Sequence, residues 1–176
     1  MIAFALLIAA CGGSSGNTAS NSPEASPSPS KEATISSVDA CKLVTATDAT
    51  SAVGMAMTNM AASSGVSIPG ACIYASADGS TSVFVLAQTY PDVNTAQSVS
   101  PDQIAAAMNG QYGVTNAKSV AGIGDKAVEY TASSSGGTGV AIFVFKSNVV
   151  LMIILSPSTD GSKVEQLART ALGNLH

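Results

Sequence analysis

Two apolar runs near the C-terminal end constrain the fold of this 176-residue chain more than any other feature. Residues 140–145 (VAIFVF) and 149–155 (VVLMIIL) are separated only by Lys146-Ser147-Asn148. Runs of β-branched and aromatic residues joined by a short polar connection predict a β-hairpin. The second run scarcely alternates between apolar and polar residues, which is typical of a strand buried on both faces. We therefore expect this strand at the centre of a sheet, with helices on both faces.

Turn and capping residues predict the other elements. Asp78-Gly79 lies between two strand-like runs, which indicates a second hairpin. Thr45 with Asp48 three residues later has the spacing of a capping box, and Gly54 is expected to end the helix that begins there. The predicted order is a helix at 45–54, strands at 72–76 and 82–87, a helix from Asp92 that restarts at Pro101, strands at 127–131, 140–145 and 149–155, and a final helix from Asp160. This order predicts an α+β domain with a mainly antiparallel sheet flanked by helices.

The spacing of apolar residues predicts which face of each helix is buried. The expected inward residues are Val44, Ala49, Ala52 and Val53 for the first helix, Ile104, Ala107 and Met108 for the middle helix, and Val164, Leu167, Ala168, Ala171, Leu172 and Leu175 for the last. On the exposed side of the last helix, Glu165 and Arg169 are one turn apart, so we expect them to form an ion pair.

The N-terminal residues resemble the signal of a bacterial lipoprotein. An uncharged apolar segment ends in Ile8-Ala9-Ala10-Cys11, and it is too short to cross a bilayer of about 30 Å as a helix. The resemblance implies that residues 1–10 are a signal peptide and that Cys11 becomes the lipidated N-terminus, with acyl chains such as palmitate. Several acyl chains on one residue anchor a protein stably. The basic residues that usually precede such a segment are missing from this sequence.

A linker rich in Ser, Gly and Pro extends from Cys11 to residue 38. It has little apolar surface to bury, so we expect a disordered spacer. Residues 39–176 are then expected to form a single α+β domain on the extracytoplasmic face of the cell membrane, attached through the lipid. Gly12 would permit the outer membrane if the host were Gram-negative.

Two further cysteines form one even pair. With Cys11 lipidated, Cys41 and Cys72 remain, and outside the cytoplasm such a pair is most simply a disulfide. The alternative is a two-cysteine metal or redox site, for which the close spacing and the histidine partners are missing.

Composition argues against nucleic acid and against an organic cofactor. The chain has 7 Lys and Arg against 11 Asp and Glu, without a basic run, so we expect no nucleic-acid partner. The segment Gly122-Ile-Gly-Asp-Lys-Ala127 matches a dinucleotide fingerprint, but a strand-like rather than a helical sequence follows it. We therefore interpret the glycines as a tight loop before a strand and expect no cofactor.

Three methionines are the one candidate set of metal ligands. Met55, Met57 and Met60 are thioethers of the kind that bind Cu(I). Methionine is also an ordinary core residue, and alternation along a short strand explains Met55 and Met57 without metal. A copper site is therefore the weaker of the two interpretations, and we expect no metal.

The sequence does not predict an enzyme. His176 is the single histidine and is the last residue, and no Gly-x-Ser-x-Gly or His-Glu-x-x-His motif is present. Most acidic residues are explained as helix-start or turn residues: Asp48, Asp78, Asp92, Asp102 and Asp160. Asp125 and Glu129 are a loop-and-strand pair, and two of the acids could meet in a cleft. We expect no catalytic residue.

The order of these features resembles the Cys-pair lipoproteins of unknown function that are common in actinobacteria. The resemblance rests on the anchor cysteine and linker, residues 39–43 before a capped helix, Cys72 at the start of a strand, and residues 122–127 before the last strands and helix. It implies a PsbP-like α/β/α sandwich and supplies no catalytic residue. Tyr74 stands where those proteins commonly have tryptophan.

These observations favour a binding role in the cell envelope. We expect a membrane-anchored, non-enzymatic lipoprotein that binds an envelope partner or a small apolar ligand. The alternatives are a structural surface protein and, with less support, a hydrolase or a Cu(I)-binding protein.

Overall fold

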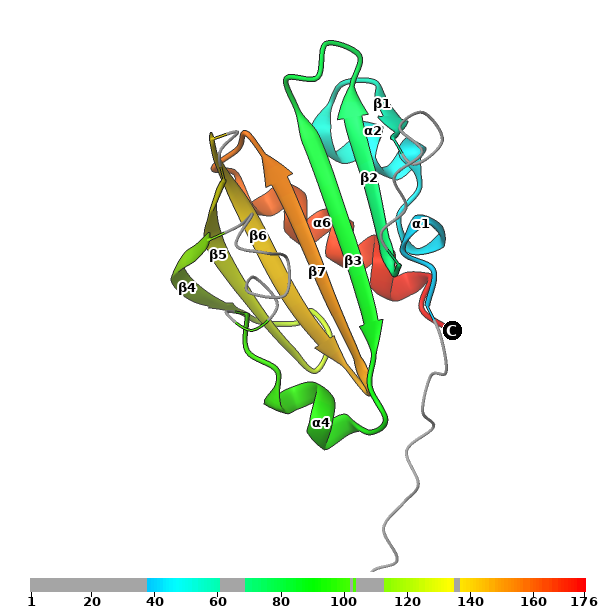
Figure 1. The fold of residues 1–176 in the computed structure, drawn as a ribbon, viewed down its shortest axis with the longest axis vertical. Helices are drawn as coiled ribbons and strands as arrows, with labels where there is room; N and C mark the ends of the chain where they lie inside the picture. Colours follow the sequence, from blue (N-terminus) through cyan, green and yellow to red (C-terminus); the bar gives the residue numbers. More distant parts are fainter. Residues whose placement is uncertain (1–37, 61–68, 102, 104–112, 135–136) are drawn as a thin grey trace, which may run out of the picture. The chain divides into compact units, whose positions relative to one another are not determined.

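The computed structural model describes residues 38–60, 69–101, 103, 113–134 and 137–176. These residues form a seven-stranded sheet in the order β1-β2-β3-β7-β6-β5-β4, in which every neighbouring pair is antiparallel (Figure 1). The strands are β1 Met57–Asn59, β2 Ala71–Ser76, β3 Ser82–Thr89, β4 Gly113–Val120, β5 Lys126–Ser134, β6 Gly137–Lys146 and β7 Val149–Ser156. The helices are α1 Ala40–Leu43, α2 Ala46–Val53, α4 Val93–Ser98 and α6 Gly161–Gly173. The predicted α+β class, with a mainly antiparallel sheet flanked by helices, is confirmed.

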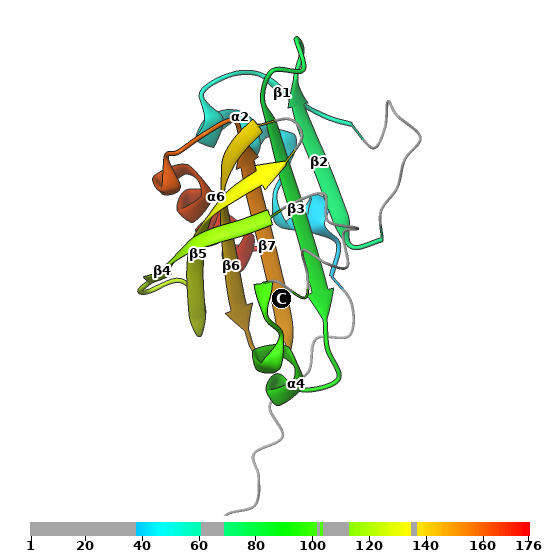
Figure 2. The same cartoon turned by 60° about the vertical axis from the view of Figure 1, so that its left-hand side comes forward.

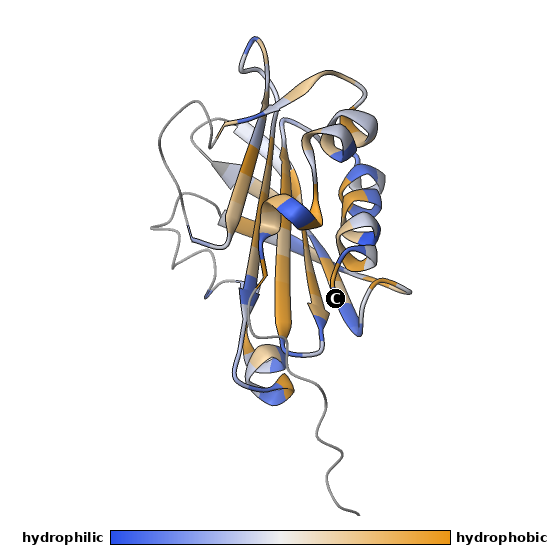
Figure 3. Cartoon of the chain, turned by 90° about the vertical axis from the view of Figure 1, so that its right-hand side faces the viewer, coloured by the Kyte–Doolittle hydropathy of each residue, from blue (hydrophilic) through white to orange (hydrophobic). Residues whose placement is uncertain are grey.

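Strand β7 occupies the centre of the sheet, as its continuous apolar sequence predicts. It pairs with β3 on one side and with β6 on the other, and three strands lie beyond it in each direction. Ile153 faces one hydrophobic cluster and Ile154 faces the other, and both are almost completely buried. Figure 3 shows the hydrophobic residues concentrated in the strands. The two sides of this strand therefore belong to two separate layers of the core.

Helices α1, α2 and α6 cover one face of the sheet (Figure 1). The predicted inward residues of α6 are confirmed for Val164, Leu167, Ala168 and Ala171, whereas Leu172 and Leu175 are only partly buried. The predicted ion pair between Glu165 and Arg169 is wrong within the part of the chain that the structure describes. Arg169 instead donates a hydrogen bond of 2.8 Å to the Gly122 carbonyl oxygen, because the loop before β5 lies within its reach.

The first helices follow the predicted capping chemistry. Thr45 and Asp48 form a reciprocal capping box at the start of α2, and Gly54 ends the helix in a left-handed conformation with φ of 85°. The four predicted inward residues of this region are all buried. The short helix α1 was not predicted; Asp39 caps it by accepting a hydrogen bond from the Cys41 N–H.

The opposite face of the sheet carries the second cluster, built around aromatic side chains. Phe84, Phe143 and Phe145 are buried there, and Tyr130 packs edge-on against Phe143 at 5.5 Å between ring centroids. Helix α4, capped by Asp92, contributes the buried Ala96. The predicted inward residues Ile104, Ala107 and Met108 lie outside the described residues. A helix on this face is therefore confirmed only for α4.

Two edge strands complete the sheet, and neither follows from an apolar run. Strand β4 is almost entirely exposed, and its register with β5 shifts between Thr115 and Lys118. Asn116, within this irregularity, has a positive φ of 55°. Figure 2 shows β4 crossing at a large angle to β3, as the twist of an antiparallel sheet requires. In the described ranges we find no helix with the length and apolar character needed to cross a membrane.

Candidate functional site

The predicted disulfide is present. Cys41 of α1 and Cys72 of β2 are bonded at 2.02 Å between sulfur atoms, which ties the first helix to the hairpin strand. Cys72 is 1% exposed, so the bond is part of the core. The structure shows this disulfide rather than a two-cysteine metal or redox site. Cys11, the predicted lipidation site, lies outside the described residues.

Tyr74 closes the core beside the disulfide. Its hydroxyl oxygen lies 3.1 Å from Cys72 Sγ and donates a hydrogen bond to the Val44 carbonyl oxygen. Asn59 Nδ2 donates to Cys72 Sγ at 3.3 Å. Burial, and to a lesser extent the negative charges of Asp48 and Asp39, raise the pKa of Tyr74 to about 12. Between pH 10 and about 12 the Tyr74 phenol therefore stays protonated in the folded protein, whereas it would ionise in the unfolded chain.

This pKa shift makes the stability of the fold depend on pH in the alkaline range. An unfolded tyrosine has a pKa of about 10, so stability is complete below that pH and falls as pH rises toward the folded value of about 12. We expect a loss of about 2–3 kcal/mol across that interval. Urea unfolding at pH 9 and at pH 11.5 would measure it, with Tyr74→Phe expected to remove most of the difference.

Tyr90 provides the matched control for this measurement. Burial also raises its pKa, but its hydroxyl donates to Gln88 Oε1 at an exposed position. Tyr90→Phe should leave most of the pH dependence in place. If Tyr74→Phe and the unaltered protein lost the same stability, the assignment to Tyr74 would be wrong.

The three methionines lie in different environments. Met57 is buried among core residues, whereas Met55 is 43% exposed and precedes the strand. Met60 is partly buried just after the same strand. Met57 therefore has the packing role that alternation predicted. Among the described residues, no group of three or more His, Cys, Asp or Glu side chains is placed to hold a metal ion.

The glycine loop before β5 is the tight loop that the sequence predicted. Residues 121–125 form turns and bends, and β5 follows directly. Asp125 accepts hydrogen bonds from Lys146 Nζ at 2.8 Å and from the Ser147 N–H at 2.7 Å. The Lys146 contact and the Ser147 bond hold the pKa of Asp125 below its usual range. This acid therefore fixes the β6–β7 turn.

The other acids also have structural roles. Asp39, Asp92 and Asp160 cap helices, Asp48 completes the capping box, and Asp78 accepts bonds from Ser76 and Ser80 in the hairpin turn. Asp102 lies outside the described residues. His176 is exposed at the C-terminal end.

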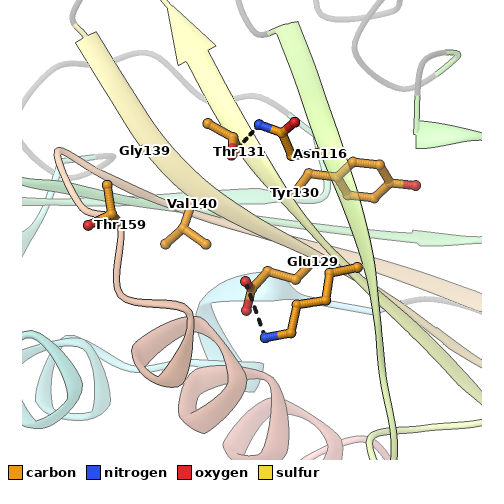
Figure 4. Close-up of a pocket in the computed structure, with 8 residues that line it drawn as sticks. Asn116, Glu129, Tyr130, Thr131, Gly139, Val140 and Thr159 are labelled. Carbon is orange, nitrogen blue, oxygen red and sulfur yellow. Dashed lines mark hydrogen bonds and ion pairs between the residues drawn. The ribbon is translucent and has the colours of Figure 1, made fainter.

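A groove lies on the helix-covered side of the sheet, beside the start of α6 (Figure 4). Its volume is about 230 Å³. It lies over β4, β5 and β6, with the loop before α6 forming another wall, and Figure 4 shows the side chains of Glu129 and Thr159 on different sides of it. The lining residues are Asn116, Lys118, Glu129, Tyr130, Thr131, Gly139, Val140 and Thr159. We define these residues as the β4–β6 groove.

Glu129 is the central charged group of this groove. Its side chain is 16% exposed, and Oε1 lies 3.9 Å from Lys118 Nζ, whose side chain is 68% exposed. Oε2 is buried and has no hydrogen-bond partner among the described residues. Buried polar atoms are nearly always hydrogen-bonded, so an unpaired carboxylate oxygen needs an explanation. Here Oε2 lies against Gly161 at the start of α6 rather than toward the open side of the groove.

Gly161, the first residue of α6, makes room for this carboxylate. A Cβ atom at position 161 would come within 1.9 Å of Glu129 Oε2 and 2.7 Å of Oε1. The carboxylate therefore occupies space that any other residue would fill.

The sequence singled out Asp125 and Glu129 together, but the structure gives them different partners. Asp125 pairs with Lys146, whereas Glu129 is near Lys118, so they do not form an acid–base pair. The groove was missed because Lys118 belongs to an unpredicted strand and Gly161 is far away in sequence. The available signal was an acid at an inward position of a strand, between Ala127 and Thr131.

The class that this fold defines is a disulfide-containing α+β domain with an antiparallel sheet. Two solved structures are similar to it. The extracellular domain of PknH from Mycobacterium tuberculosis is 10% identical, with a TM-score of 0.49 over 77% of this chain and 93% of that chain. Cyanobacterial PsbP from Synechocystis sp. PCC 6803 is 17% identical, with a TM-score of 0.38 over 64% of this chain and 77% of that chain.

A cyanobacterial PsbP is among the structures to which this chain is similar. At these TM-scores neither similarity supports an argument about activity or partners. No protein-family model matches the chain. No curated protein gives a significant match. Membership in the Cys-pair lipoproteins stays a prediction.

Proposed function

We propose that this chain is a lipid-anchored binding protein of the cell envelope that acts without enzymatic turnover. The observation that carries the binding role is the β4–β6 groove, a concave space lined in part by the Glu129–Lys118 pair. A concave site with a few convergent polar groups is the usual form of a small-ligand site. Glu129 is the one acid among the lining residues, so the lining offers a counter-ion rather than an acid–base pair.

The character of the groove refines the expected ligand. The sequence favoured an apolar ligand or an envelope partner, and the lining combines the charged and hydroxyl side chains of Lys118, Glu129, Thr131 and Thr159 with the apolar Val140. Among the described residues, Met55 is the one large hydrophobic side chain that is exposed. A small ligand with both a polar and an apolar part fits these observations.

The extracytoplasmic location is supported by the chemistry of two cysteines. A disulfide between Cys41 and Cys72 belongs to an oxidising compartment. The lipoprotein-like sequence before Cys11 would bring the domain there and keep it at the membrane. These are independent features, and both favour the extracytoplasmic face.

Lipidation can be tested directly. In a bacterial host grown with an alkyne analogue of palmitate, the full chain should take up label and remain with membranes. Cys11→Ser should lose both the label and the membrane association, whereas Cys72→Ser should keep the label. Labelling that persists in Cys11→Ser would contradict the anchor.

Ligand binding can be tested on the same membrane-extracted protein. Native mass spectrometry should show a discrete added mass above the denatured, lipidated chain, and Glu129→Gln should reduce its occupancy. A retained protein partner would point to the envelope-partner role instead. Turnover of ester, peptide or glycoside substrates by the purified protein would show that the non-enzymatic proposal is wrong.

A further inference from the structure

We propose that Met55 is a reversible oxidation site, at which a peroxide converts the exposed thioether to a sulfoxide while the domain stays folded. Met55 is not among the residues that line the β4–β6 groove, so this site is separate from the proposed binding function. Two observations carry the proposal: the side chain is exposed to solvent, and the backbone on both sides of it is held by the fold.

The four methionines that the structure describes differ in how far solvent reaches them. Met55 is 43% exposed, whereas Met57 is 6% exposed and Met152 is 1% exposed. Met60 is partly buried. An oxidant in solution must reach the sulfur atom before it can react. Met55 is therefore the methionine of this set that a dissolved peroxide meets first.

The exposure of Met55 is a property of the folded chain. Helix α2 ends at Gly54, whose N–H donates to the Thr50 carbonyl oxygen at 2.9 Å. The Met57 N–H donates to Thr50 Oγ1 at 3.0 Å. Thr50 thus holds the backbone before and after Met55, so that Met57 packs into the core and Met55 stays at the surface.

The reaction transfers one oxygen atom. The Met55 sulfur attacks one oxygen of hydrogen peroxide, the O–O bond breaks, an S=O bond forms and water leaves. The thioether loses two electrons and the peroxide gains them. A methionine sulfoxide reductase reverses the change with two thiols, which become a disulfide as the sulfoxide oxygen leaves in water.

The environment of Met55 allows the product to form without loss of the fold. A sulfoxide is polar, and its oxygen accepts hydrogen bonds that water supplies at an exposed position. At Met57 the same oxygen would be buried among apolar side chains, where an unsatisfied polar group is costly. The buried methionines should therefore react only when the domain opens.

The test is oxidation of the full chain in detergent by hydrogen peroxide, followed over time by mass spectrometry of its peptides. We expect Met55 to gain the mass of one oxygen atom at least about tenfold faster than Met57 and Met152, because its sulfur is open to solvent. In urea the three rates should become similar, since unfolding exposes every side chain. Equal rates for Met55 and Met57 in the folded protein would overturn the proposal.

Two variants localise the reaction. Met55→Leu should remove the fast oxygen uptake on this peptide, whereas the matched control Met57→Leu should leave the rate at Met55 unchanged. Thermal unfolding of each variant checks that it is folded.

The oxidised protein tests reversibility. Protein with sulfoxide at Met55 should unfold within about 2 °C of the unoxidised chain, because little buried surface is lost. Methionine sulfoxide reductases for both epimers should restore the thioether in the folded protein. A large fall in the unfolding temperature, or a sulfoxide that both reductases leave in place, would overturn the reversible site.

Discussion

Removal of the Cys41–Cys72 disulfide is expected to lower the free energy of unfolding by roughly 3–4 kcal/mol. The two cysteines are 31 residues apart, and the chain-entropy model gives about this value for a closed loop of that length. The bond also joins α1 to β2 inside the core, beside Tyr74. A loss of this size is a large share of the roughly 5–15 kcal/mol by which domains are stable. Urea unfolding of the Cys41→Ala, Cys72→Ala double variant would measure it.

The control is Lys42→Ala, because Lys42 is next to Cys41 in α1. Lys42 is largely exposed, and its contact with Asp39 is 4.0 Å, so this substitution should change stability by less than about 0.5 kcal/mol. A reducing agent added to the unaltered protein should reproduce the loss seen in the double variant. A change below about 1 kcal/mol in the double variant would contradict the stabilising role of the bond.

Elements with a local chemical signal were predictable from sequence. The capping box of Thr45 and Asp48 formed as expected, because both partners are within one turn of helix. The turn at Asp78-Gly79 and the turn at 146–148 each joined the two strands expected to flank it. The central place of β7 followed from its burial requirement, since only an inner strand buries both faces.

Elements that depend on distant partners were not predictable in this way. Strand β4 has a polar, exposed sequence, and it is a strand because β5 offers it a free edge. Arg169 has a suitable acid one turn away, but the Gly122 carbonyl competes for it across the fold. The groove was not predictable for the same reason, because Lys118, Glu129 and the neighbouring Gly161 come from three separate elements. Its chemistry exists only after the sheet and α6 have assembled.

Phe143→Ala is expected to lower the free energy of unfolding by about 3–5 kcal/mol. Phe143 is 0% exposed in β6, packs edge-on against Tyr130, and is paired in register with Met152 of β7. Truncation removes a ring that is surrounded on the second face of the sheet and leaves a cavity that neighbouring strands cannot close. Met55→Ala, at a position 43% exposed, should change stability by less than about 0.5 kcal/mol.

Urea unfolding monitored by circular dichroism would compare these two variants with the unaltered protein. The comparison tests the second layer of the core specifically, because Phe143 belongs to the cluster opposite α6. A loss below about 1.5 kcal/mol for Phe143→Ala would mean that this face collapses easily around the missing ring. The full loss would show that the side chains around Phe143 on this second face of the sheet are well packed.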